Sequence, residues 1–188
     1  MNPLRILCLG ALLFSGMGSA DAQATATPAT AEVGGHGLVL NGKATRTVWG
    51  FPVYHVGLFL EERNPDGVAI MTADRGAKRI HMNMLRAVGK KDFMATVREN
   101  VDQNLTAAEK ETYATELSAY LGHLEKGGDI QPGRIITIDY VPGQGTVLGL
   151  DGRQVGTIAG HDFYHVMLRL WIGRPLQASI KEGLLGGG

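Results

Sequence analysis

The chain has 188 residues, and its 18 lysines and arginines are balanced by 18 aspartates and glutamates, so the formal net charge is zero. This balance argues against nucleic-acid binding, which requires a basic face that releases counterions from the phosphates. The length is sufficient for one domain with a substantial hydrophobic core.

Residues 1–22 have the features of a secretory signal peptide. Arg5 supplies a positive charge, the apolar run Ile6 to Met17 follows, and Ala20-Asp21-Ala22 fits the small-residue pattern before a cleavage site. No later segment approaches the roughly 20 apolar residues that a membrane span requires. We therefore expect a periplasmic or secreted protein with no permanent membrane span after cleavage. The alternative is an uncleaved N-terminal anchor.

The segment after the predicted cleavage site differs in composition from the rest of the chain. Residues 23–35 are small and polar and include proline and glycine, which predicts a disordered leader before a domain at 36–188. In that domain, Asn41-Gly42 lies between the strand-like segments 37–40 and 44–49 and predicts a two-residue hairpin turn. A strand is predicted at 51–60, a short helix at 65–73, and a strand with alternating apolar residues at 78–85.

Two helices are predicted in the middle of the chain. An apolar residue recurs every four positions in 90–105, as expected for a helix with one buried face. Thr106 and Glu109 have the spacing of a capping box, which predicts that a second helix begins there and ends at Gly127-Gly128.

The remaining elements are strands followed by helices. Strands are predicted at 134–141 and 146–150, and a hairpin turn at Asp151-Gly152 leads into a further strand ending at Ile158. Helices are predicted at 161–172 and 178–184. Strands that lie on both sides of a helical block and are joined by hairpins favour an α+β fold, with an antiparallel sheet and helices layered on one face.

Arg46 and Tyr54 are the most promising candidates for a binding site. Each lies in a strand that is otherwise rich in apolar residues. A guanidinium and a phenol that converge in an apolar cavity would hold a carboxylate. The alternative is a surface arginine beside a half-buried tyrosine. Met82, Met84 and Met167 lie on apolar faces, where flexible thioethers suit either a ligand cavity or an ordinary core.

Other kinds of site find little support. His161 and His165 share a helix face, as metal ligands do, but they lie opposite the apolar face and are expected to point to solvent. Gly143-Gln144-Gly145 is read as a turn because no G-x-G-x-x-G pattern continues from it. The sequence therefore predicts no metal site and no cofactor.

Four stretches, in this order and spacing, resemble the chalcone isomerase-like family in its bacterial exported branch. They are Leu40–Thr47, Val53–Leu60, Ile138–Thr146, and Gly156–Phe163 with Leu170–Gly173 beyond it. The resemblance runs from about Leu40 to Leu185. It implies an open-faced β-sandwich, in which a large antiparallel sheet carries helices on one face and a ligand cleft lies between the two layers.

The resemblance also assigns positions in the cleft. Arg46 matches the cleft arginine of plant chalcone isomerases, and their catalytic threonine falls on Tyr54. In their Tyr-x-x-Lys-x-x-x-Asn helix, the tyrosine is replaced by Phe93 and the lysine by Thr96, and Asn100 is retained. A late threonine or serine of the enzymes falls on Leu170.

These departures favour a binding protein over an enzyme. Non-enzymatic relatives of this fold bind fatty acids with an arginine and a tyrosine, so the expected ligand is a fatty acid or a similar apolar carboxylate. The expected ligand-binding residues are Arg46, Tyr54, Met82, Met84, Phe93, Val97, Asn100 and Met167. One alternative is an intramolecular lyase or isomerase that acts on a phenolic or enone substrate with Arg46 as the catalytic group. Another is a partner-binding module without a small ligand.

Overall fold

The structure, a computed structural model, describes residues 27–73 and 75–187. The predicted signal peptide and the first four residues of the predicted leader lie outside these ranges. Within them, no helix combines the length and the apolar character needed to cross a membrane.

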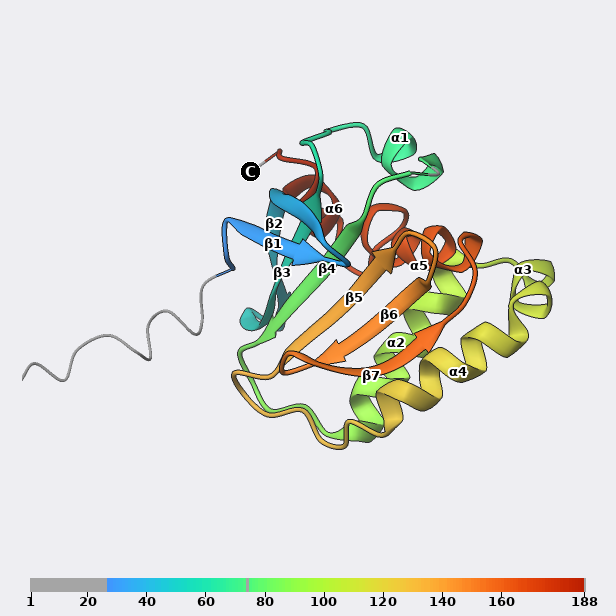
Figure 1. Cartoon of the computed structure of the whole chain (residues 1–188). Coiled ribbons are helices and arrows are strands. Elements are labelled where there is room, and N and C mark those ends of the chain that lie inside the picture. Colours follow the sequence, from blue (N-terminus) through green and yellow to red (C-terminus); the bar gives the residue numbers. More distant parts are fainter. Residues whose placement is uncertain (1–26, 74, 188) are drawn as a thin grey trace, which may run out of the picture.

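Seven strands form one antiparallel sheet in which each strand pairs with its neighbours in the sequence (Figure 1). Along each strand, side chains point alternately to the two faces of the sheet. The strands are β1 (Thr30–Val33), β2 (His36–Val48), β3 (Phe51–Leu60), β4 (Lys78–Met84), β5 (Ile135–Val141), β6 (Gly145–Leu150) and β7 (Arg153–Ile158).

The helices pack on one face of this sheet (Figure 1). They are α1 (Gly67–Thr72), α2 (Lys90–Asn104), α3 (Ala107–Thr112), α4 (Ala114–Glu125), α5 (Asp162–Ile172) and α6 (Ala178–Leu184). The larger hydrophobic core lies between the two layers and includes Leu58 and Ile80 from the sheet and Val101 and Leu168 from the helices. A smaller apolar cluster on the opposite face contains no helical residue among those described. This arrangement confirms the predicted fold class.

The predicted hairpin turn at Asn41-Gly42 is wrong, because β2 runs straight through these residues with only a bulge. The Asn41 side chain is buried and bridges two other segments. It donates to the Leu184 carbonyl at 2.8 Å and accepts from the Asn64 backbone N–H at 2.7 Å. A Cβ atom on Gly42 would overlap the carbonyl oxygen of Gly183. The pair therefore allows α6 to approach the strand closely and does not reverse the chain.

The turns lie on either side of this strand. Gly34-Gly35 joins β1 to β2, and Trp49-Gly50 joins β2 to β3. All four residues have positive φ, as type I′ hairpin turns require. The prediction of a disordered leader at 23–35 is therefore wrong for Thr30–Val33, which pair with β2 as strand β1.

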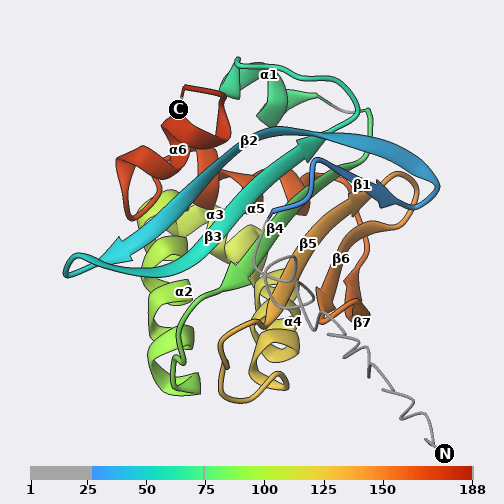
Figure 2. The same cartoon turned by 90° about the vertical axis from the view of Figure 1, so that its left-hand side faces the viewer.

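The β2–β3 hairpin extends beyond the sheet at its Trp49-Gly50 end. Pairing between β3 and β4 stops at Tyr54 and Met84, whereas β2 and β3 continue to pair as far as Val48 and Phe51. Figure 2 shows this hairpin as a long two-stranded projection at one side of the molecule.

The other predicted elements are found with small shifts. The strand at 51–60 and the helix at 178–184 have the predicted bounds. The predicted capping box is confirmed, since Thr106 and Glu109 each bond to the backbone N–H of the other. The helix that it opens is interrupted at Tyr113, whose backbone leaves helical geometry and separates α3 from α4.

Candidate functional site

A cavity of about 250 Å³ lies between the sheet and the helices. Residues from β2 to β5 line one side of it, and residues from α2, α4 and the end of α5 line the other. The lining is apolar apart from a few polar groups, of which Arg46 is the only charged one among the described residues. The full lining is Arg46, Val48, Val53, Tyr54, Met82, Met84, Val88, Phe93, Thr96, Val97, Asn100, Tyr120, Leu124, Ile136, Ile138, Leu170, Trp171 and Leu176.

A bulge in β3 shapes the sheet side of this cavity. Arg46 pairs with Tyr54 and Thr47 pairs with Pro52, so Val53 is an extra residue on β3. Consecutive residues of a regular strand point to opposite faces, yet Val53 and Tyr54 both line the cavity. The bulge redirects these side chains, a common feature beside functional sites.

The Arg46 guanidinium has only weak partners within the protein. Its Nη1 donates to the Leu176 carbonyl at 3.3 Å and to Gln177 Oε1 at 3.4 Å. Across residues 27–73 and 75–187, no carboxylate forms an ion pair with it. The Gln177 amide also holds β2 in place, accepting from the Thr47 N–H at 2.9 Å and donating to the Thr45 carbonyl at 3.2 Å. The cation is thus positioned but not neutralised.

Tyr54 lies directly opposite Arg46 on the neighbouring strand. Burial raises the pKa of Tyr54 to about 12, although the nearby Arg46 cation acts in the other direction. The phenol is therefore neutral at pH 7 and can donate a hydrogen bond. Its ring contacts the Trp171 ring edge to face at 6.3 Å. No residue in the described part of the chain forms a hydrogen bond with its hydroxyl.

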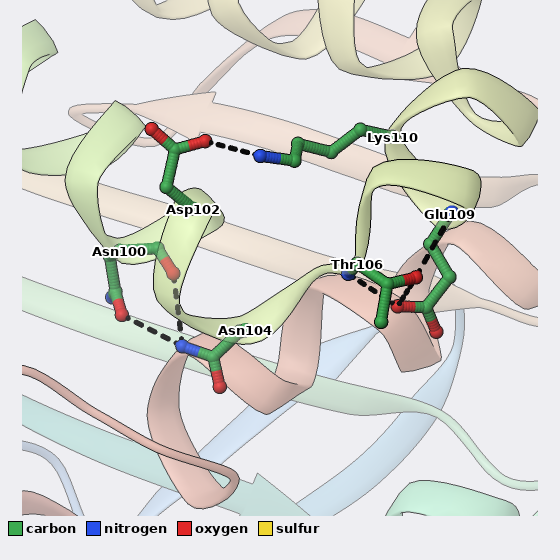
Figure 3. A network of polar contacts seen from close by, with 6 residues as sticks. All are labelled: Asn100, Asp102, Asn104, Thr106, Glu109 and Lys110. Atoms are coloured by element: carbon green, nitrogen blue, oxygen red, sulfur yellow. Dashed lines mark hydrogen bonds and ion pairs between the residues drawn. The ribbon is translucent and has the colours of Figure 1, made fainter.

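Asn100 also lines the cavity, but its amide is engaged in holding the helices together. Its Nδ2 donates to the Leu170 carbonyl of α5 at 3.1 Å. Its Oδ1 and backbone carbonyl accept from Asn104 Nδ2, as Figure 3 shows. Asn104 is buried and also bonds the backbone of Arg174, so the pair fixes the end of α5 against α2. These contacts satisfy the hydrogen-bonding groups of Asn100 within the protein, so its position in the lining needs no ligand to explain it.

The structure brings seven of the eight predicted ligand-binding residues to this cavity. Met167 is the exception, because it is buried in the core and is absent from the lining. Only the C-terminal end of α5, at Leu170 and Trp171, reaches the cavity, and Met167 lies one turn earlier.

Sequence reasoning missed Trp171, Leu176 and Gln177. The last two follow α5 and approach Arg46 from a point about 130 residues further along the chain. No local pattern indicates such an approach. Trp171 had a signal, since a large aromatic residue beside Leu170 extends the apolar face of α5, but the helix orientation needed to place it was unknown.

A second depression, of about 530 Å³, lies on the opposite face of the sheet and is a weaker candidate. Its Arg79 forms a two-point ion pair with Asp139, with distances of 2.7 and 2.6 Å. Burial, together with Arg79, lowers the pKa of His81, which is therefore neutral at pH 7. The two partly buried charges at this depression, Arg79 and Asp139, neutralise each other, whereas Arg46 pairs with no carboxylate among the described residues.

The prediction that His161 and His165 point to solvent is wrong. Both are half-buried, and their rings lie 5.5 and 5.8 Å from the Tyr140 ring. Nowhere in the described ranges do three or more potential ligands gather in a way that would hold a metal ion.

The comparison with protein families settles the relationship. The model of the chalcone isomerase-like family matches residues 19–186, which is nearly the whole chain. The chain belongs to the chalcone isomerase-like family. Among solved structures it is similar to a fatty-acid binding protein of Arabidopsis thaliana, AtFAP1, with a TM-score of 0.64 and 16% sequence identity over 85% of this chain and 90% of that one. No curated protein shows a significant match.

The positions that the chalcone isomerase-like resemblance singled out lie together in the structure. All of them line the one cavity, although they come from β2, β3, α2 and α5. They are Arg46, Tyr54, Phe93, Thr96, Asn100 and Leu170.

Proposed function

We propose that this protein binds a fatty acid or a similar apolar carboxylate in the cavity between its sheet and helices, without catalysing a reaction. One observation carries the proposal: Arg46 is a cation that faces an apolar cavity and has no carboxylate partner in residues 27–73 and 75–187. A charge in such surroundings is costly unless it is paired. An anionic ligand would supply the partner.

Tyr54 also favours an anionic ligand. Its hydroxyl, neutral at pH 7 and opposite Arg46 across the strands, can donate to a carboxylate oxygen while the guanidinium donates to the other. The similarity in fold to AtFAP1, a fatty-acid binding protein, agrees with this assignment.

The remainder of the cavity suits a hydrocarbon tail. Sulfur-containing, aromatic and branched side chains surround it, including Met82, Phe93, Val97, Leu124 and Ile138. A volume near 250 Å³ lies slightly below the range of about 300–1000 Å³ that is typical of ligand sites. This size favours a tail of medium length over a long one.

The proposed place of action is the periplasm. This rests on the signal-peptide pattern of residues 1–22.

Calorimetric titration of a fatty acid and of the alcohol of equal chain length tests whether Arg46 and Tyr54 hold the carboxylate. Hydrogen bonds to charged groups contribute about 1.5–3 kcal/mol, and 1.4 kcal/mol is about tenfold in affinity. Arg46→Ala should therefore weaken the acid by roughly tenfold or more and leave the alcohol nearly unchanged. Tyr54→Phe keeps the ring and should weaken the acid somewhat less.

Arg153→Ala is the matched control, because Arg153 is an exposed arginine of β7 that does not line the cavity. It should bind both ligands as the wild type does. If Arg46→Ala weakens the acid and the alcohol equally, Arg46 supports the strand and does not hold a carboxylate, and the proposal fails.

A further inference from the structure

The tip of the β2–β3 hairpin carries an exposed apolar cluster, which we call the hairpin tip and define as Val48, Trp49 and Phe51. Trp49 is 94% exposed, Phe51 56% and Val48 37%. Of the large apolar side chains exposed in the described residues, only Val68 lies elsewhere. Large apolar groups that gather at one exposed point commonly mark an interaction site.

The hairpin tip projects from the body of the protein. Among the described residues, the last backbone hydrogen bond at this end of β3 with the segment of β4 joins the Leu85 N–H to the Val53 carbonyl at 2.8 Å, so the residues of β2 and β3 beyond it form a two-stranded extension (Figure 2). Trp49 occupies the turn itself, with a positive φ of 53°. A side chain at the turn can contact an external surface without any movement of the sheet.

The hairpin tip is continuous with the cavity. Val48 belongs to the tip and also lines the cavity. Arg46 and Val53, further along the same hairpin, line the cavity as well. A surface that covers the tip would therefore lie beside Arg46 and Tyr54, the proposed carboxylate-binding residues.

The surroundings of the hairpin tip are basic. The Arg86 guanidinium lies over the Phe51 ring, 4.6 Å from its centroid. The segments 46–55 and 84–91 meet at the Tyr54–Met84 pair and contain Arg46, Arg86, Lys90 and Lys91 and no acidic residue, and Asp92 follows in the first turn of α2. Asp129 lies at the start of α2, where it accepts from the Lys90 backbone N–H, and Arg86 is the cation in direct contact with a residue of the tip.

We propose that the hairpin tip inserts into the interface of a lipid bilayer containing anionic lipids, and that the cavity thereby opens toward the membrane. Tryptophan is enriched at the level of lipid headgroups, and basic residues beside an apolar insertion favour anionic lipids. Two aromatic side chains and a valine bury about 400–600 Å² at most, which is less than the roughly 800 Å² per partner of a stable protein interface. A narrow projecting tip therefore fits a bilayer better than a second copy of this chain.

Insertion itself requires no ligand, but its use for exchanging a fatty acid rests on the function proposed above. The two can fail separately, because vesicle binding is measured without fatty acid and fatty-acid binding is measured without vesicles.

The test is flotation of the protein, purified in the form its host cell produces, with two kinds of vesicle. One contains phosphatidylcholine alone, and the other contains equal amounts of phosphatidylcholine and phosphatidylglycerol. The wild type should float with the anionic vesicles, and brominated lipid should quench its tryptophan fluorescence. The double variant Trp49→Ser, Phe51→Ser should bind at least tenfold more weakly, since each aromatic side chain loses a large part of its transfer free energy. Arg86→Gln should reduce the preference for phosphatidylglycerol.

Val68→Ser is the matched control, because Val68 is 66% exposed on α1 and lies outside the hairpin. Val68→Ser should float as the wild type does. Both Val68→Ser and the double variant should retain wild-type affinity for fatty acid in solution. Equal flotation of the wild type and the double variant would overturn the proposal. So would the absence of vesicle binding together with a dimer that the double variant abolishes, which would identify a second copy as the occupant.

Discussion

Phe93 and Leu170 place hydrocarbon at two cavity positions where the resemblance to plant chalcone isomerases implies hydroxyl groups in those enzymes. Ring closure of a chalcone needs a polarised carbonyl and an ordered, deprotonated phenol, and proton transfer by a positioned side chain typically contributes about 10²–10⁴-fold to a rate. Arg46 remains, but a cation alone does not order a phenolate. Asn100, also retained, is engaged with the Leu170 carbonyl.

We therefore expect the protein to convert chalcone to flavanone within about tenfold of the uncatalysed rate. Absorbance at a fixed pH, with and without protein, measures both rates. A larger enhancement that disappears in Arg46→Ala would show that the cavity is an active site.

Which residues share the cavity was predictable from the sequence wherever a pattern fixed the strand or helix face. Met82 and Met84 lie on a strand whose side chains alternate, so their common face followed from the period. Alternation could not place Tyr54 in the same way, because the bulge at Val53 interrupts it. The placing of Met167 required the angle at which α5 crosses the sheet. Periodicity gives a buried face, but it does not say which turn of that face reaches a cavity.

At the scale of single elements, β2 shows how the same dipeptide can have two uses. Asn41-Gly42 has the composition of a turn, but in this chain its glycine admits the backbone of α6 against the strand. The error in prediction had a physical cause: the partner of Gly42 lies about 140 residues away, at Gly183 and Leu184. The turn residues Trp49-Gly50 were harder to recognise, because tryptophan is unusual at positive φ.

Gly42→Ala should destabilise the protein by about 1–3 kcal/mol, the usual cost of overpacking, because the new methyl group would overlap backbone atoms that have little room to move. Urea denaturation provides the measurement, as a lower midpoint with an unchanged slope.

Gly37→Ala is the control within the same strand, since no atom lies within 4 Å of the position of its added methyl group. It should be neutral or slightly stabilising, because alanine is preferred to glycine inside a strand. Equal losses for both variants would mean that the approach of α6 is unimportant.

At the scale of the whole molecule, the architecture agrees with the sequence reasoning, since hairpin-linked strands predicted an antiparallel sheet with helices on one face. The similarity to AtFAP1 at 16% identity indicates that this arrangement tolerates wide sequence change. The location of the protein in the cell is a separate question, which depends on residues 1–22.

We expect the mature chain to begin at Gln23 and to occur in the periplasmic fraction, because Ala20-Asp21-Ala22 precedes that residue. N-terminal sequencing of protein from fractionated cells measures both properties. Recovery of intact Met1 in the membrane fraction would instead support an N-terminal anchor.

The sheet order has a consequence for how ligand preference can change over evolution. Strands β4 and β5 pair directly, and residues 85–134, with α2, α3 and α4, leave and return between them. The side chains that this excursion adds to the cavity, such as Phe93, Val97 and Leu124, can vary without disturbing the register of any strand pair. Arg46 and Tyr54 lie within that register. Under the proposed function, the residues that hold the carboxylate belong to the sheet, whereas part of the surface that contacts the tail belongs to the excursion and can change independently.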